Sequence, residues 1–195
     1  MRALFSNVKN VFAGKIAAYV YSSTDSLVIS ALISTVQVGY LVNYTTISQQ
    51  LKILIAGLLN PITPVIGNVL ATDSEGESKE GAFKLYAVMR VLIAMMIVVP
   101  FCVLINDFIA IWVGAEYILP ASVVMLLVMD LYIHFVHSVN VDFINAGGLF
   151  REDRDNEIIA AVLNIALSIL GAKTIGLAGV LLGTVVSQMW FWFGR

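Results

Sequence analysis

Long apolar runs alternate with short polar segments along the whole chain, and this alternation predicts a bundle of membrane-spanning helices. The runs fall near 10–33, 38–71, 85–106, 119–145, 156–172 and 176–193. Each run can supply the roughly 17–25 residues that a spanning helix needs. We therefore expect an all-α, multi-pass transmembrane bundle that forms a single domain over residues 1–195, with about one span per run.

The cations between the runs predict the orientation of this bundle. If the N-terminus lies inside, the inner segments carry Arg2, Lys9, Lys79, Lys84, Arg151, Arg154 and Arg195. The outer segments, near 34–37, 107–118 and 173–175, then carry only Lys173. Positive residues concentrate on the cytoplasmic side of membrane proteins. The chain is therefore expected to be multi-pass with its N-terminus inside.

Composition agrees with a chain that has little water-facing surface. Hydrophobic residues make up 59% of the sequence and charged residues 12%, whereas a soluble domain carries about 25% charged residues. The net charge of −2 says little, because the distribution of charge along the chain carries the information and its total does not. Cys102 lies inside an apolar run and is expected to be a small buried hydrophobe.

Several local signals refine the expected helices. The run 38–71 is too long for one straight span, and Asn60, Pro61 and Pro64 should kink or break it, because proline removes a backbone donor. We expect inner loops at 72–84 and 146–157 and a short interfacial piece at 107–118. Arg90, one turn inside the third run, is expected to extend toward the headgroups.

Small residues recur at spacing four in the last two runs. They are Ala160, Asn164, Ser168 and Ala172 in the fifth run, and Gly179, Gly183 and Ser187 in the sixth. Such seams let membrane helices approach closely. We read both seams as packing surfaces that carry no chemistry.

Ionisable residues within the runs are the candidates for function, because each costs about 2.5–3.5 kcal/mol to insert. They are Lys15, Asp25, Lys52, Asp130, His134, His137 and Asp142. This number of ionisable residues within apolar runs predicts a polar, water-accessible path between the helices. Lys15 either snorkels to the inner face or lines this path. Asp25 lies deeper and either lines the path or bonds to neighbouring helices, and it is a candidate ion-pair partner for Lys52.

Asp130, His134 and His137 share one helical stripe, at offsets of four and then three. This stripe is compatible with a polar packing seam, with a proton relay, or with zinc ligation. The chain has two His and one Cys in all, so we expect no metal and no other cofactor. Motifs for nucleophilic elbows, zinc hydrolases and phosphate-binding loops are absent, and we expect a protein that is not an enzyme.

Blocks of sequence resemble the second lobe of bacterial polysaccharide flippases, in the multidrug/oligosaccharidyl-lipid/polysaccharide superfamily. In order, they are Ser23-Thr24-Asp25-Ser26-Leu27-Val28-Ile29-Ser30, Val38-Gly39, Asn43-Tyr44, Gly67-Asn68-Val69-Leu70-Ala71, Ile111-Trp112-Val113-Gly114 with Glu116-Tyr117, Gly148-Leu149-Phe150 with Asp153-Arg154, Asn164, Ser168, and Ile175-Gly176-Leu177-Ala178-Gly179-Val180 with Gly183-Thr184. The blocks run nearly the whole chain. Ser34 and Leu41 depart from the family pattern, in which Gly and Tyr are usual.

The resemblance implies a transporter of two six-helix lobes around a central cavity in the bacterial cytoplasmic membrane. Such proteins move undecaprenyl-pyrophosphate-linked oligosaccharides between leaflets by alternating access. Lys15, Asp25, Asn43 and Lys52 become candidates for contact with this lipid-linked substrate. Asp130, His134 and His137 become candidates for proton or ion coupling.

Because the resemblance covers the second lobe, we expect the chain to be a fragment whose facing wall comes from an N-terminal lobe or from a second copy in a homodimer. Membrane lipids complete its surroundings, and no nucleic acid is expected. Three alternatives stay open: half of a cation-coupled drug exporter, a membrane enzyme of glycan assembly, and an inactive remnant.

Overall fold

The computed structural model describes residues 12, 19, 23–72, 77–148 and 150–193, and all regular secondary structure among these residues is helical. A helical segment at 23–32 comes first. It is followed by α2 (Thr35–Leu59), the 3₁₀ turn η1 (Asn60–Ile62), α3 (Thr63–Thr72), α4 (Glu77–Trp112), the 3₁₀ turn η2 (Ala115–Tyr117), α5 (Ala121–Gly147), α6 (Phe150–Thr174) and α7 (Leu177–Phe193). The expected all-α bundle is confirmed.

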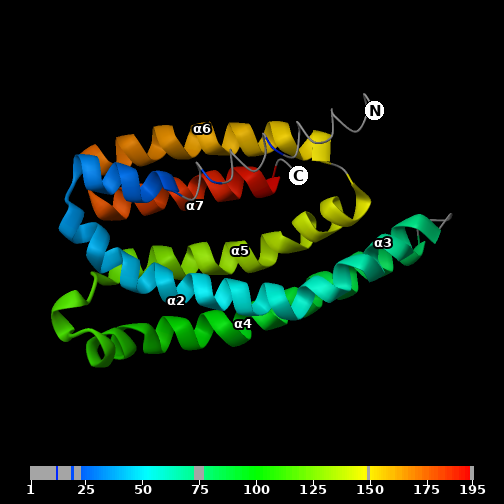
Figure 1. Cartoon of the computed structure of the whole chain (residues 1–195), viewed down its shortest axis with the longest axis horizontal. Helices are drawn as coiled ribbons and strands as arrows, with labels where there is room; N and C mark the ends of the chain where they lie inside the picture. The colour runs from blue at the N-terminus through cyan, green and yellow to red at the C-terminus, as the bar shows by residue number, and fades with distance from the viewer. Residues whose placement is uncertain (1–11, 13–18, 20–22, 73–76, 149, 194–195) are drawn as a thin grey trace.

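The helices form two groups joined by α5 (Figure 1). One group contains α6, α7 and the segment 23–32, and the other contains α2, α4 and α5. Within them, α6 packs closely on α7, and α5 packs on both α4 and α7. Helix α5 is therefore the element through which the two groups contact each other.

The exposed faces of the helices are apolar. Ile111, Met96 and Leu85 on α4 expose 88%, 77% and 74% of their surface. Four helical stretches, Thr35–Thr72, Ser78–Trp112, Ala121–Gly147 and Asp155–Thr174, are long and apolar enough to cross a bilayer. A soluble protein rarely exposes so continuous an apolar surface. Both observations support a bundle that is embedded in a membrane.

The break expected in the run 38–71 is confirmed. Helix α2 ends at Leu59, η1 contains Pro61, and α3 resumes at Thr63. Pro61 and Pro64 lack the N–H groups that would continue the ladder of α2. Helix α3 then turns toward the end of α5, where a Cβ placed on Gly67 would lie 3.6 Å from the carbonyl oxygen of Ala146.

The expected loops are wrong in extent, because the helices continue beyond the apolar runs. Helix α4 begins at Glu77, within the expected loop 72–84, and ends at Trp112, within the expected interfacial piece 107–118. Its 36 residues extend about 54 Å, well beyond a hydrocarbon core of about 30 Å. Polar residues at its start form a solvated helix surface, on which Lys84 pairs with Glu80 at 2.6 Å.

The expected inner loop 146–157 is also mostly helical. Helix α5 continues to Gly147, and α6 begins at Phe150. Gly148 has a left-handed backbone with φ of 70°, which glycine adopts without a steric penalty. A single glycine therefore ends α5 and allows α6 to start almost at once.

The apolar core centres on α5 and the connection between α4 and α5. Phe135 and Leu131 of α5 are almost fully buried. Tyr44 of α2 is buried beside them, and its hydroxyl donates to Asn106 Oδ1 at 2.8 Å and accepts from the Leu119 N–H at 3.1 Å. Cys102 is exposed on α4, so the expectation that it is buried is wrong.

The small-residue seams in the last two helices are confirmed as a close contact. Asn164, Ser168 and Ser187 are fully buried between α6 and α7. A Cβ on Gly179 would overlap the backbone of Gly171 on the facing helix. The two helix backbones therefore touch where these glycines meet.

We predict that Gly179→Ala destabilises the protein by about 1–3 kcal/mol, because the added methyl forces α6 and α7 apart. Gly39→Ala is the matched control, since a Cβ on Gly39 meets nothing within 4 Å. That change should be neutral or slightly stabilising, because alanine favours a helix over glycine. Denaturation midpoints in detergent measure the stability of both variants. Equal midpoints for Gly179→Ala and Gly39→Ala would contradict the close contact.

Candidate functional site

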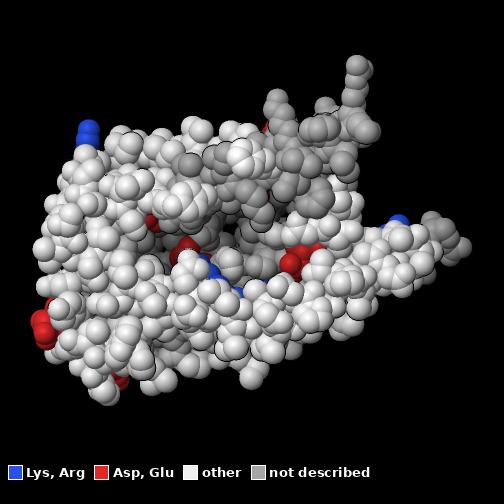
Figure 2. Space-filling model, in the orientation of Figure 1, with Lys and Arg blue, Asp and Glu red and all other residues white. Residues whose placement is uncertain are grey.

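A polar cavity of about 490 Å³ opens between the two groups of helices. Its walls come from the segment 23–32, α2, α5 and α7. The lining residues are Asp25, Ser26, Leu41, Thr45, Thr46, Gln49, Gln50, Lys52, Leu126, Leu127, Asp130, His134, Leu181, Thr184 and Gln188. Figure 2 shows charged atoms gathered in a hollow in the middle of this face, between helix surfaces that carry almost none.

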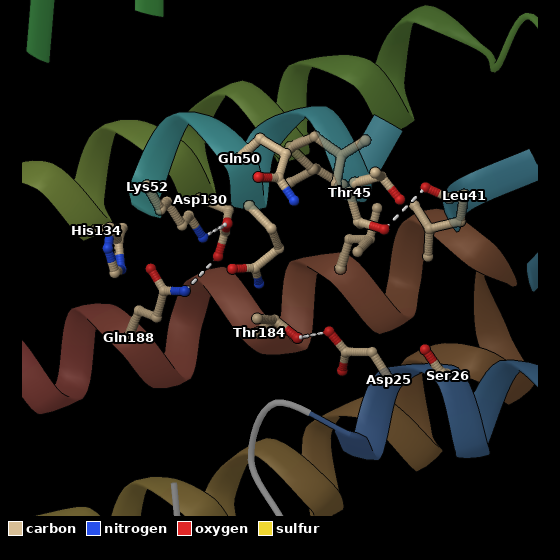
Figure 3. A pocket seen from close by; sticks show the side chains of 15 residues that line it. Asp25, Ser26, Leu41, Thr45, Gln50, Lys52, Asp130, His134, Thr184 and Gln188 are labelled. Carbon is tan, nitrogen blue, oxygen red and sulfur yellow. Dashed lines mark hydrogen bonds and ion pairs between the residues drawn. The ribbon is translucent and has the colours of Figure 1, made fainter. Parts of the chain in front are cut away.

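The centre of the cavity holds an ion pair. Lys52 on α2 lies with its Nζ 2.9 Å from Asp130 Oδ2 on α5, and both side chains are largely buried. Gln188 on α7 donates from its amide to the other carboxylate oxygen, Asp130 Oδ1 (Figure 3). Asp130 therefore joins three helices through its two oxygen atoms.

Lys52 forms the ion pair that was one of its predicted roles, but its partner is Asp130, so the candidate pairing with Asp25 is wrong. Asp25 lies across the cavity, where Thr184 Oγ1 of α7 donates to its Oδ2 at 2.7 Å. Ser168 Oγ of α6 lies 3.3 Å from Asp25 Oδ1. Spacing along a helix predicts which face a residue occupies, but not which neighbouring helix that face meets. The sequence alone allows Lys52 to pair with either Asp25 or Asp130. The packing of the helices places Asp130 beside it.

Of the other residues that the sequence analysis singled out, some line the cavity and others do not. His134 lines the cavity with Asp130, whereas His137 is buried and is not part of the lining. The stripe on α5 therefore enters the cavity through its first two members. Asn43 is partly exposed on α2 and does not line the cavity. Lys15 lies outside the described residues.

A second buried ion pair joins α4 to α5. Arg90 of α4 pairs with Asp142 of α5. Its Nε donates to the hydroxyl of Tyr86 at 3.0 Å, and that hydroxyl donates to the same Asp142 carboxylate. Arg90 is only 5% exposed, so the expectation that it extends to the headgroups is wrong. Its charge is compensated inside the bundle.

Sequence reasoning missed the polar residues that surround the charged ones. Thr184 and Gln188 lie four residues apart on α7 and so share a face. Thr45, Gln49 and Lys52 recur in the same way on α2. This helical spacing of hydroxyl and amide groups was the available signal. In the last helix, each of these polar residues directly follows a small one, Gly183 or Ser187.

No family model matches the chain, and neither the curated proteins nor the solved structures include a significant match to it. Among the described residues, no cluster of three or more His, Cys, Asp or Glu side chains is arranged to hold a metal ion. The chemistry of the cavity follows from its own side chains: hydroxyl and amide groups, one compensated ion pair, and a carboxylate held by hydroxyls.

We predict that Lys52→Ala and Asp130→Ala each destabilise the protein by about 1–3 kcal/mol, because each leaves the opposite charge without its partner. The charge-reversed double variant Lys52→Asp, Asp130→Lys should recover much of this loss. Lys84→Ala, which breaks the exposed pair with Glu80, is the control and should cost no more than about 0.5 kcal/mol. Additive losses in the double variant, measured by denaturation in detergent, would refute the pairing.

Proposed function

We propose that this bundle is one lobe of a flippase for lipid-linked oligosaccharides in a bacterial cytoplasmic membrane, with its N-terminus inside. The sequence blocks that resemble the second lobe of polysaccharide flippases support this proposal. The single structural observation that carries it is the polar cavity between apolar helices, which gives a hydrophilic headgroup a path through a layer that would otherwise exclude it.

The size and lining of the cavity suit a sugar headgroup. Its volume of about 490 Å³ lies within the range of about 300–1,000 Å³ that is usual for ligand sites. Thr45, Thr46, Gln49 and Gln50 offer hydroxyl and amide groups along one wall. These groups both donate and accept hydrogen bonds, as sugar hydroxyls do.

Lys52 is the group that would meet the pyrophosphate. Among the described residues that line the cavity, it is the Lys or Arg side chain. In the structure its charge is satisfied by Asp130 at 2.9 Å. An entering pyrophosphate would share Lys52 with Asp130, whose other carboxylate oxygen still accepts from the amide of Gln188.

A drug exporter is the less favoured alternative. Cavities that accept lipophilic cations need apolar and aromatic walls that contact the drug. Among the residues that the structure describes, those that line this cavity include no Phe, Tyr or Trp. Polar side chains predominate in the part that α2 supplies.

The facing wall of the transport path is part of the proposal. The cavity opens on one face of the bundle (Figure 2). A second lobe, either an N-terminal lobe or a second copy of this chain, would enclose the headgroup between two walls. Rocking of the two lobes would then expose the headgroup to each side in turn.

We predict that the purified protein in lipid nanodiscs binds a fluorescent polyprenyl-pyrophosphate oligosaccharide, and that Lys52→Gln weakens this binding at least about tenfold, or 1.4 kcal/mol. Lys52→Arg should largely preserve it, because the positive charge remains. Lys84→Gln is the control, since Lys84 is exposed and outside the cavity.

Two results would refute the proposed substrate. One is equal affinity for the charged lipid and for a glycolipid without phosphate. The other is tight binding of a lipophilic cation such as ethidium together with no binding of the pyrophosphate lipid. Reconstituted vesicles, with a membrane-impermeant lectin outside, then measure whether bound sugar reaches the opposite leaflet.

A further inference from the structure

We propose that the end of the cavity away from Lys52 selects oligosaccharides whose last sugar, the one farthest from the pyrophosphate, is a 6-deoxyhexose. Such a sugar carries a methyl group in place of a hydroxymethyl group. The residues that make this selection are Leu41 of α2, Leu127 of α5 and Leu181 of α7, which all line the cavity. This inference rests on the proposed function, because it concerns the sugars of the same lipid-linked substrate.

The helices that line the cavity give it a common direction. Helices α2, α5 and α7 run the same way across the bundle (Figure 1). The contacts of Asp130 with Lys52 and with Gln188 place these three residues at one level. Residues counted back from this level therefore measure height along the cavity wall, at about 1.5 Å per residue.

Along α2, the lining changes from amide and hydroxyl groups to an apolar side chain with distance from the ion pair. Thr45 lies about 10.5 Å from the level of Lys52 along the helix axis, and Leu41 lies about 16.5 Å from it. Figure 3 shows Gln50, Thr45 and Leu41 following the ion pair in this order along one wall. The α2 wall therefore begins at a charged group and ends at a leucine.

The hydroxyl group of Thr45 adds an acceptor to this end of the cavity, but its own hydrogen is engaged. Thr45 Oγ1 donates within its helix, where it lies 3.2 Å from the carbonyl oxygen of Leu41 and 3.3 Å from that of Val42. The amide groups of Gln49 and Gln50, which can donate to a sugar, lie nearer to the ion pair. Hydrogen-bond donors on α2 therefore become scarcer toward Leu41.

Two further leucines continue the apolar end on the neighbouring helices. Leu127 and Leu181 are packed into one apolar cluster with Leu41. Leu181 lies about 10.5 Å from the level of Gln188 along α7. Leu41, Leu127 and Leu181 expose only 3%, 4% and 6% of their surface. The cavity therefore reaches the edge of the apolar core at this end.

The polar groups of the facing segment lie nearer to the ion pair than Leu41 does. Thr184 lies about one turn, or 6 Å, from the level of Gln188, and it donates to Asp25 at 2.7 Å. Asp25 therefore lies close to that height, and Ser26 follows it directly. The apolar end of the cavity lies beyond this level.

This gradient matches a ligand that is charged at one end and apolar at the other. With the pyrophosphate at Lys52 and the sugars along α2, the last sugar lies beside Leu41 and Leu181. A methyl group there moves from water to an apolar surface, which is favourable. A hydroxymethyl group instead brings a hydroxyl group to a place with few partners, and burying an unpaired hydroxyl group is unfavourable.

The test compares two lipid-linked trisaccharides that differ in one group. Both are fluorescent polyprenyl-pyrophosphate lipids, and one ends in a hexose and the other in the corresponding 6-deoxyhexose. We expect the purified protein in lipid nanodiscs to bind the 6-deoxy ligand at least about tenfold more tightly. The corresponding pair of monosaccharides should show no preference, because a single sugar stays near Lys52.

Two substitutions at Leu41 separate the polarity of the site from its shape. Leu41→Gln places an amide at the apolar end and should remove most of the preference. Leu41→Met has a similar length, stays apolar and should keep it. Leu54→Gln is the control, because Leu54 is exposed on α2 and does not line the cavity. If Leu41→Gln fails to fold, the comparison of ligands on the unchanged protein still decides.

The outcomes distinguish this selection from the proposed function. Equal affinity for the two trisaccharides, with both bound, would overturn the selection and leave the proposed function standing. A preference that is equal for monosaccharides and trisaccharides, or that persists in folded Leu41→Gln, would also overturn the selection. Binding of neither ligand would overturn the proposed function and this inference with it.

Discussion

The structure depends on one constraint: a charge inside an apolar layer must be compensated by a nearby partner. An uncompensated charge there costs several kcal/mol, which is comparable with a large part of the stability of a protein. Lys52 and Arg90 each meet this constraint through a carboxylate on α5. Asp25 meets it differently, through hydroxyl groups on two other helices. Every described charge well inside the bundle therefore specifies which helices must lie side by side.

This constraint makes α5 the organising helix. Its Asp130 contacts Lys52 of α2 and Gln188 of α7, and its Asp142 contacts Arg90 of α4. Apolar packing between helices gains little in a bilayer, because lipid tails are as apolar as the side chains. Polar contacts and close backbone approach therefore carry much of the specificity. The arrangement of three helices around α5 follows from two carboxylates twelve residues apart on one helix.

The sequence was sufficient for the parts of the fold that depend on local pattern. Hydropathy predicted the helical bundle, and Pro61 and Pro64 predicted the break between α2 and α3. The loops were predicted too long, because hydropathy marks where a helix leaves the apolar layer, whereas the helix itself ends where its backbone turns. Gly148 marks such an end. The partner of Lys52 could not be predicted, because that depends on the rotation of each helix against its neighbours.

Helix α7 connects the two polar groups of the cavity. One face packs on α6 through Gly179 and Gly183, and the other presents Thr184 to Asp25 and Gln188 to Asp130. Because Thr184 and Gln188 lie about one turn apart, roughly 6 Å along the axis, a rotation or shift of α7 changes both contacts together. The glycine contact holds α6 directly against α7. The hydrogen bond at Asp25 and the hydrogen bond at Asp130 therefore both depend on the position of one helix.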